Sequence, residues 1–292
     1  MDEIDFIILK KLMENSRVTY RELAEIINMS VSSTYKGINK LVDDEVIEAF
    51  TARPSAIALN YLSVIIHGTS KAKSMDLLSK ELGQHESIKF IAITGGKFLY
   101  IGGYLRDLSE LQDFSVYVSK TAQMNEPTIG IINIPYITPP ESLTSIDYKI
   151  LKSLNKDSRM PITDIADDVG LSAKTVRKRL DRMIKNNLIL FTLELSVMKV
   201  FSTGFNLYLK EGTNIASTMQ YLYEKYSKNI SYCYSCSNIP NYIAMHTWTK
   251  NAQGSQKIQE ELQTEGFQDV IPHIFLTSKF YDCWIDQLLR TK

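Results

Sequence analysis

The sequence has little that would mark a secreted or membrane-spanning protein. Its 292 residues include only three cysteines, too few for a disulfide framework, and the odd number suits a reducing compartment. No apolar run approaches the roughly 18 residues needed to span a bilayer, and the first residues are acidic where a secretory signal needs basic ones. We therefore expect a cytoplasmic protein with no membrane partner.

An excess of basic residues is also missing. The 33 lysines and arginines are balanced by 33 aspartates and glutamates, so any DNA-binding surface must arise from local clustering of charge. With 44% hydrophobic residues, the chain can bury the cores of about two to four small domains. The composition predicts an ordinary globular protein.

Residue groupings typical of catalysis are absent too. The four histidines are scattered (His67, His85, His246 and His273), and no nucleophile stands with a base, nor is there a phosphate-binding glycine loop. Cys233 and Cys236 have zinc-knuckle spacing, but they lie in a predicted strand, where residues three apart point to opposite faces. The sequence therefore predicts no catalytic residues, no metal site and no cofactor.

What the chain does contain is an internal repeat. Sliding the sequence by 142 positions superimposes some forty residues without a gap, including Ser16-Arg17 on Ser158-Arg159. Between the copies, residues 135–142 predict a linker, because their three prolines continue neither a helix nor a central strand.

The first part of each copy predicts three helices. Apolar residues recur at helical spacing in residues 4–12 and 146–154. A second helix opens on the capping box of Thr19 and Glu22.

A sharp turn then leads into the third helix. The second helix ends at Asn28 in one copy and Gly170 in the other, residue types that accept a left-handed backbone. Ser30 and Ser172 are N-caps of the third helix. A short apolar strand follows in each copy (residues 47–52 and 189–195), which completes the order of a winged helix-turn-helix.

The rest of each copy predicts a ferredoxin-like plait, in the order strand, helix, strand, strand, helix, strand. The predicted elements are residues 62–67, 72–82, 88–94, 98–105, 108–122 and 128–134, then 204–210, 215–226, 230–236, 242–249, 255–262 and 270–276. Because helices cover only one face of such a sheet, we expect the two plaits to pack sheet on sheet, within one chain or across a dimer. Aromatic residues on these strands are interpreted as core or interface filling (Tyr61, Tyr100, Tyr104, Tyr232, Tyr234, Tyr242 and Trp248).

The predicted fold class is α+β, with two winged helix-turn-helix domains alternating with two ferredoxin-like βαββαβ domains. The expected boundaries are 1–50, 51–134, a linker over 135–142, 143–192 and 193–292.

This order and the motifs of the second copy resemble the leucine-responsive regulatory protein and asparagine-synthetase regulator (Lrp/AsnC) family. The likeness is carried by Ile146-Asp147, Asp157-Ser158-Arg159, Asp164-Ile-Ala166, the run from Gly170 to Leu180, and Asn187-Leu-Ile189. In the first copy, Gly37 stands where the family has a recognition-helix arginine, matched by Arg179 in the second, and Glu45 replaces the usual turn glycine.

The resemblance implies a DNA-binding transcription regulator whose partner is double-stranded DNA. Family members have one such unit per chain and pair through the plait, so it also implies a fused pair, a homo-oligomer formed through the plaits, and an archaeal source. An amino-acid effector is implied at the turn of Thr94, Gly95 and Gly96, with a plain hairpin turn as the alternative.

Candidate DNA-binding residues lie on the third helix of each copy. In the second copy they are Ser172, Lys174, Thr175, Arg177, Lys178, Arg182 and Lys185, and in the first they are Ser32, Ser33, Tyr35, Lys36 and Lys40. Residues 146–189 contain ten basic and six acidic residues, a net charge of +4, whereas residues 4–47 contain six and seven, a net charge of −1. The second unit is therefore expected to bind DNA more strongly, the alternative for both faces being a solvated helix surface.

An enzyme of the same architecture is the second hypothesis. Siroheme decarboxylases resemble this chain in domain order and use the plait pair to hold a tetrapyrrole. Such enzymes carry His and Arg near the second strand pair, where this chain has His246 but otherwise Ser231-Tyr-Cys-Tyr-Ser.

Overall fold

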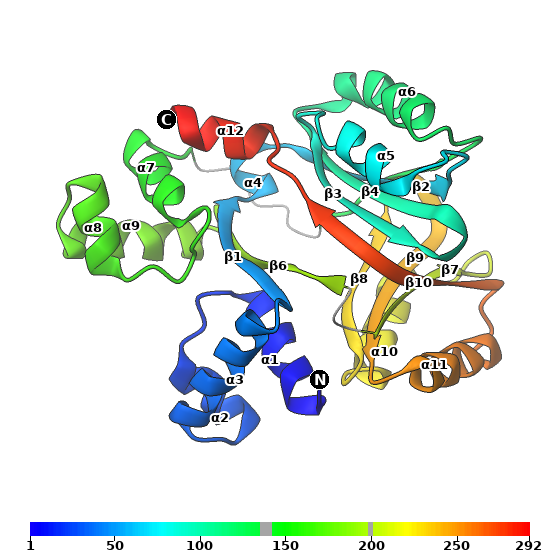
Figure 1. The fold of residues 1–292 in the computed structure, drawn as a ribbon, viewed down its shortest axis with the longest axis horizontal. Helices are drawn as coiled ribbons and strands as arrows, with labels where there is room; N and C mark the ends of the chain where they lie inside the picture. The colour runs from blue at the N-terminus through cyan, green and yellow to red at the C-terminus, as the bar shows by residue number, and fades with distance from the viewer. Residues whose placement is uncertain (135–141, 198–200) are drawn as a thin grey trace.

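A computed structural model describes residues 1–134, 142–197 and 201–292. All of the expected linker except Ser142 lies outside the described residues. The model confirms the α+β class, with two winged helix-turn-helix units on one side of the molecule and two plaits on the other (Figure 1). No helix within the described ranges is both long enough and apolar enough to cross a membrane.

Both helix-turn-helix units have the predicted elements. The first unit consists of α1 (Glu3–Glu14), α2 (Tyr20–Ile27), α3 (Val31–Asp43) and β1 (Ile47–Pro54), and the second of α7 (Ser145–Leu154), α8 (Ile162–Val169), α9 (Ala173–Lys185) and β6 (Ile189–Leu195). The Thr19 and Glu22 capping box is present. Asn28 and Gly170 adopt the left-handed backbone at φ 53° and 66°, as their residue types predict.

The two units meet around an approximate two-fold axis. The wing strands β1 and β6 pair antiparallel with each other, a contact that the sequence did not predict. Ser16 Oγ and Ser158 Oγ, which are equivalent in the repeat, lie 2.5 Å apart and buried. The arginine after each serine reaches across the axis: Arg17 donates to Ser158 O at 2.5 Å, and Arg159 to Ser16 O at 2.7 Å. The repeat is therefore also a symmetric interface within one chain.

Each plait follows the predicted order. The first contains β2 (Leu62–Thr69), α5 (Met75–Leu82), β3 (Ile88–Thr94), β4 (Phe98–Leu105), α6 (Leu111–Thr121) and β5 (Thr128–Ile131), and the second β7 (Phe201–Tyr208), α10 (Ile215–Lys225), β8 (Ile230–Cys236), β9 (Ile239–Thr249), α11 (Ala252–Thr264) and β10 (Asp269–Phe280). The helix expected from residue 72 begins only at Met75, because Ser74 accepts the amide hydrogen of Leu77 and caps it.

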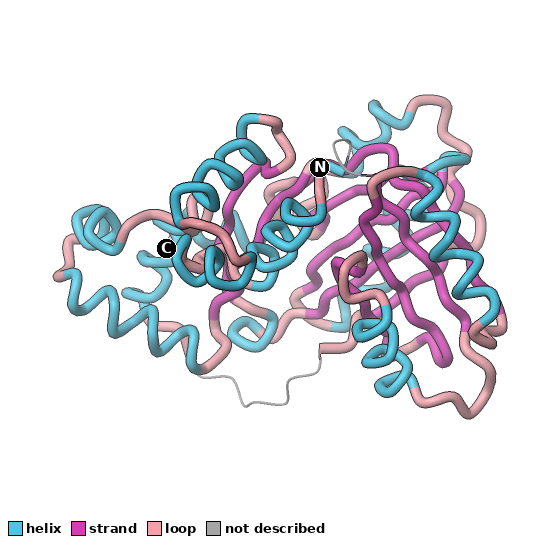
Figure 2. Tube along the Cα trace, turned by 90° about the horizontal axis from the view of Figure 1, so that it is seen from below, coloured by secondary structure: helices cyan, strands magenta, loops and turns pink. Residues whose placement is uncertain are grey.

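One strand belongs to both plaits. β10 pairs with β7 through Asp269 to Ile274 and then with β3 through Phe275 to Phe280, giving the order β5-β2-β4-β3-β10-β7-β9-β8. The end strands of this sheet, β5 and β8, also lie next to each other. Ser237, directly after β8, donates its backbone N–H to the carbonyl oxygen of Ile131 in β5 at 2.8 Å. Figure 2 shows the plait strands gathered together, with helices at their outer side.

The inner faces of the two plaits pack on each other, which confirms the sheet-on-sheet expectation within one chain. Ile65, Ala92 and Tyr100 of the first plait share a buried cluster with Tyr242 and Ala244 of the second. The β8 cysteines divide as their spacing predicts, since Cys233 packs with the outer core of the second plait and Cys236 with this inner cluster.

Two short helices were not predicted, α4 (Ala56–Leu59) and α12 (Trp284–Thr291). α12 links the C-terminal segment to two other parts of the molecule (Figure 1). Its Leu289 is buried in the core of the second helix-turn-helix unit, and Ile285 packs in a cluster with Tyr61 of the first plait.

Candidate nucleic-acid interface and central cavity

The recognition helix of the second unit, α9, has one buried and one basic side. Val176, Leu180 and Met183 are buried in the core of the unit. Four basic side chains are exposed on the rest of the helix: Lys174, Arg177, Lys178 and Lys185. Because these four side chains are exposed, they are available to contact the phosphates along a DNA groove.

Arg182 was expected to contact DNA, but in the structure its side chain pairs with a residue of α7. Its guanidinium donates to Asp147 Oδ2 at 2.6 Å, and the carboxylate of Asp147 is fully buried at the N-terminus of α7. Arg179 lies 3.7 Å from the other oxygen of the same carboxylate. These arginines therefore link α9 to α7, because a buried carboxylate needs a nearby cation. The first copy has Gly37 and Lys40 at the matching positions, so this link belongs to the second unit.

The small polar candidates of α9 contribute to its start. Ser172 Oγ accepts the amide hydrogen of Thr175 at 3.1 Å, and the two hydroxyl groups lie 2.9 Å apart. Both residues thus fix the end of the helix that enters a DNA groove in winged helix-turn-helix proteins.

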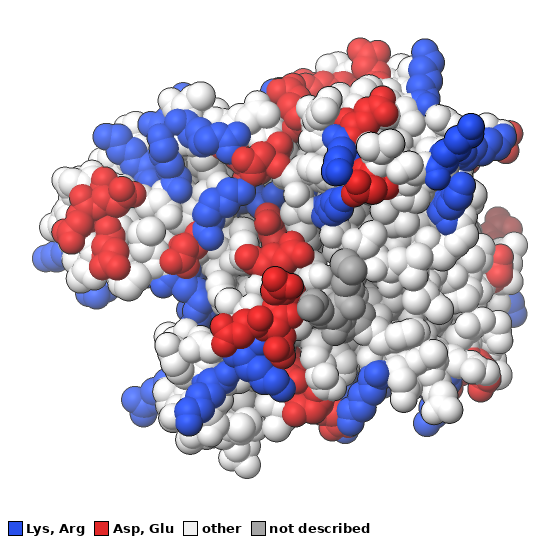
Figure 3. Space-filling view, viewed as in Figure 1, with Lys and Arg blue, Asp and Glu red and all other residues white. Residues whose placement is uncertain are grey.

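The recognition helix of the first unit, α3, exposes fewer charges. Its candidates Ser32, Ser33, Tyr35, Lys36 and Lys40 are all exposed. The Tyr35 ring packs edge-on against Tyr20 at 5.2 Å, and Arg159 from the second unit lies 4.5 Å above the Tyr20 ring. Only two cations face outward here, against four on α9. In the view of Figure 3, basic side chains gather over α7 and α12 at the left, beside acidic ones over α8.

The turn expected to bind an effector is a tight hairpin connection between β3 and β4. Thr94 Oγ1 donates to Phe98 O at 3.0 Å, and Gly96 has φ 68°, a backbone that favours glycine. A side chain at Gly95 or Gly96 would meet nothing within 4 Å. The space beside both glycines fits either alternative, so an effector at this turn stays a prediction.

A cavity of about 330 Å³ lies instead between the two plaits, against the wing strand β6. Its lining includes Phe90, Tyr100, Tyr232, Tyr234, His246 and Trp248. None of the lining residues in the described parts of the chain is Lys, Arg, Asp or Glu. The sequence had indicated the strand aromatics as core or interface filling. What it could not show is that part of the space between them stays open.

Among the described lining residues His246 is the one imidazole, and both of its ring nitrogens are engaged. Ser202 Oγ lies 2.6 Å from Nε2, and Ser231 Oγ contacts Nδ1. The Tyr232 ring stacks on the imidazole at 4.6 Å. Burial lowers the pKa of His246 to about 3, so the ring is neutral.

Burial also lowers the pKa of His67 to about 4, from an ordinary value of 6.5. Below about pH 6.5 the unfolded chain therefore takes up a proton that the folded chain does not, and stability falls as the pH drops toward 4. Between about pH 7.5 and pH 5, we expect His67 and His246 each to lower the free energy of unfolding by about 1 to 2 kcal/mol. Between these two pH values, the His67→Phe variant should lose less of its free energy of unfolding than the unchanged protein does. Urea unfolding of both proteins at each pH measures this difference. An unchanged pH dependence would contradict this assignment.

These features define a class of protein: a chain with two winged helix-turn-helix units and paired α/β domains. Residues 1–48 match the model of winged helix-turn-helix DNA-binding domains, and residues 143–184 match that of the AsnC-type helix-turn-helix domain. The chain belongs to the Lrp/AsnC family of transcription regulators.

Two archaeal relatives support this assignment. An uncharacterized HTH-type transcriptional regulator of Pyrococcus furiosus is 33% identical over 116 residues, which are 39% of this chain and 78% of that protein. One of Pyrococcus horikoshii is 34% identical over 99 residues, 34% of this chain and 67% of the other.

The full two-copy architecture is found in a solved structure. The crystal structure of the siroheme decarboxylase NirDL matches 99% of this chain and 98% of its own, with a TM-score of 0.64 and 13% identity. Its co-complex with an iron-uroporphyrin III analogue gives a TM-score of 0.62 at 15% identity, over 99% of this chain and 97% of the other. At this identity the likeness shows the fold alone.

Proposed function

We propose that this protein is a sequence-specific DNA-binding transcription regulator that uses two winged helix-turn-helix units of one chain, with the second unit as the principal DNA-binding unit. The observation that carries the proposal is the exposed basic side of α9, with Lys174, Arg177, Lys178 and Lys185 opposite a buried apolar side. Basic residues placed this way release counterions from DNA when they bind phosphates.

The symmetric contact between the units supports the proposal. In a dimeric helix-turn-helix protein, the two recognition helices must be held at a fixed spacing to read two half-sites. Here the β1 and β6 pairing and the reciprocal bonds of Arg17 and Arg159 hold both units within one chain. The inner plait faces also cover each other, so DNA binding in this proposal does not require a second chain.

A tetrapyrrole enzyme is the second candidate, favoured by the shared architecture and by His246 at the central cavity. The residues present do not fit such a group. Siroheme carries several carboxylates, and burying them without cations is costly, yet the described lining contains no Lys or Arg. The imidazole of His246 is also already bonded to Ser202 and Ser231.

One experiment separates the two candidates. The purified full chain is incubated with fragmented DNA of its source genome, and bound fragments are selected and sequenced. We expect enrichment of a two-half-site motif, with affinity falling steeply as salt rises. A parallel titration with siroheme followed by absorbance should leave the Soret band unchanged. A shifted Soret band together with no enriched DNA would contradict the proposal and favour the enzyme.

A further inference from the structure

The central cavity has room for a ligand of defined size. An apolar cavity of about 150 Å³ holds a benzene ring. At about 330 Å³, this cavity has room for two fused rings. The walls come from both plaits and the wing: Ala92 lies on β3, Ala244 on β9 and Leu193 on β6.

The wall is aromatic, and its polar atoms are largely occupied by the protein. Asn206 Oδ1 accepts hydrogen bonds from Tyr100 at 3.0 Å and from Tyr242 at 2.9 Å. His246 is bonded at both nitrogens. In the described part of the chain, the hydroxyl groups of Tyr232 and Tyr234 have no hydrogen-bond partner, and their rings lie nearly parallel, 17° apart. These two hydroxyl groups, together with that of Ser196, are polar groups at the cavity that a ligand could use.

We infer that this cavity binds a small uncharged aromatic molecule of about two fused rings. Flat aromatic walls favour a ring stacked or edge-on against them. A zwitterionic amino acid or a polycarboxylate would bring charges that no lining residue within the described ranges neutralises, at a cost of several kcal/mol. The inferred ligand thus differs in place and chemistry from an amino acid at the Thr94 to Gly96 turn.

The cavity also borders the first DNA-binding unit. Met13 of α1 lines it, together with Leu193 and Leu195 of β6. The same two leucines and Trp248 lie in the buried core of that unit. A ligand in the cavity therefore contacts side chains that hold the first unit against the plaits. Binding itself does not depend on DNA, so the inference goes beyond the proposed function and can be tested without it.

The test compares two neutral aromatic molecules with two charged ones, of which L-tryptophan carries the same ring as indole. The full chain, without DNA, is titrated with indole, 2-naphthol, L-tryptophan and uroporphyrin III by isothermal calorimetry. We expect at least one of the two neutral probes to bind, with a Kd at least ten-fold lower than that of L-tryptophan or uroporphyrin III. Failure of both neutral probes to bind, or equal or tighter binding of a charged one, would overturn the inference.

Variants locate the ligand. Ala244→Leu fills the cavity from β9 and should weaken binding of the neutral probe at least ten-fold, whereas Ala216→Leu on the exposed side of α10 should not change it. Ala92→Leu fills the cavity from the opposite plait and replaces Ala244→Leu if that variant does not fold. Binding that survives the filling substitution in a folded variant would place the ligand elsewhere and overturn the inference.

Discussion

Replacing Lys174, Lys178 and Lys185 of α9 by alanine is expected to lower DNA affinity about 100-fold at physiological salt. Each phosphate contact contributes a slope of about 0.9 to the dependence of log K on log salt, so the slope should flatten by roughly 2 to 3. These three lysines are chosen because they are exposed, whereas Arg182 is held by Asp147 and its loss would also disturb α7. Gel shift or filter binding at two salt concentrations measures both quantities.

Two controls separate local contacts from general charge. Alanine at Lys228, Lys250 and Lys257, exposed on the second plait, removes the same charge outside both recognition helices and should leave the salt slope nearly unchanged. Alanine at Ser32, Lys36 and Lys40 of α3 removes only two charges and should weaken binding less than the α9 variant. Thermal melts confirm that all three variants fold. A larger loss from the α3 variant would show that the first unit is the principal DNA-binding unit.

The sequence predicted local structure well, because short-range rules decide it. Asn28 and Gly170 adopt the left-handed backbone that their residue types favour, and Ser30 and Ser172 cap the third helices through their hydroxyl groups. The repeat itself predicted two equivalent units, since matching apolar positions dictate matching cores.

Contacts between segments that lie far apart in the chain could not be predicted from such short-range rules. β10 has the composition of one strand, and nothing in it shows that its second half pairs with β3 of the other plait. Arg182 lies at the helical spacing of an exposed basic residue, yet it reaches Asp147, 35 positions earlier. Likewise, strand aromatics look alike in sequence whether they fill a core or surround a cavity.

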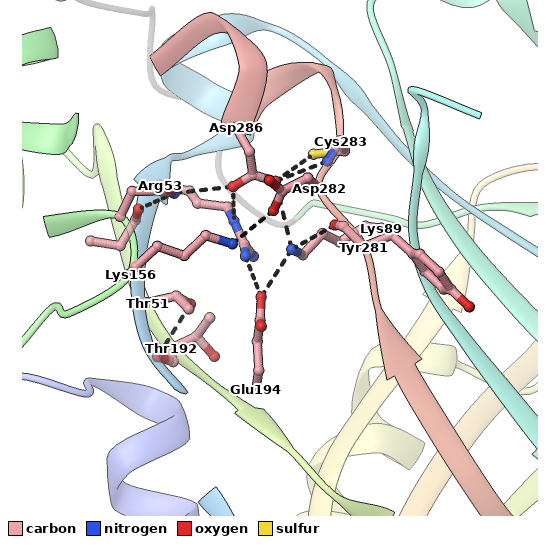
Figure 4. Close-up of polar contacts among 12 residues, drawn as sticks. Thr51, Arg53, Lys89, Lys156, Thr192, Glu194, Tyr281, Asp282, Cys283 and Asp286 are labelled. Atoms are coloured by element: carbon pink, nitrogen blue, oxygen red, sulfur yellow. Dashed lines mark hydrogen bonds and ion pairs between the residues drawn. The ribbon is translucent and has the colours of Figure 1, made fainter. Parts of the chain in front are cut away.

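A buried cluster of four charges is the clearest feature that sequence patterns missed. Arg53 of β1 lies 2.5 Å from Glu194 of β6 and 3.1 Å from Asp286 of α12, and Lys89 of β3 lies 2.9 Å from Glu194 (Figure 4). Arg53 and Lys89 are 4% and 2% exposed. The cluster thus joins both wing strands, the first plait and the C-terminal helix, with two positive and two negative groups in balance.

Asp286 has the most partners in this cluster. Its carboxylate accepts from Arg53 and Asn155 on one oxygen, and from the backbone N–H of Cys283 on the other (Figure 4). Although burial raises the pKa of this carboxyl group, the charges of Arg53 and Lys89 outweigh that effect and hold it well below its usual range. The carboxylate is therefore ionised in the folded protein, and its removal leaves two buried cations facing Glu194 alone.

Asp286→Asn should therefore lower the free energy of unfolding by about 3 to 5 kcal/mol, because it keeps the side chain's shape but leaves two buried cations with one carboxylate between them. Asp282→Asn, four residues earlier, removes a carboxylate that pairs with Lys156 at 2.7 Å in an exposed position, and should cost at most about 1 kcal/mol. The double variant with Lys89→Met and Asp286→Asn restores the charge balance. Its loss in free energy of unfolding should therefore be smaller than the sum of the losses in the two single variants. Urea unfolding at neutral pH measures the unchanged protein, the three single variants and the double variant. Equal losses from the two Asp→Asn variants, or strict additivity in the double variant, would show that the buried cluster does not hold these elements together by its charge.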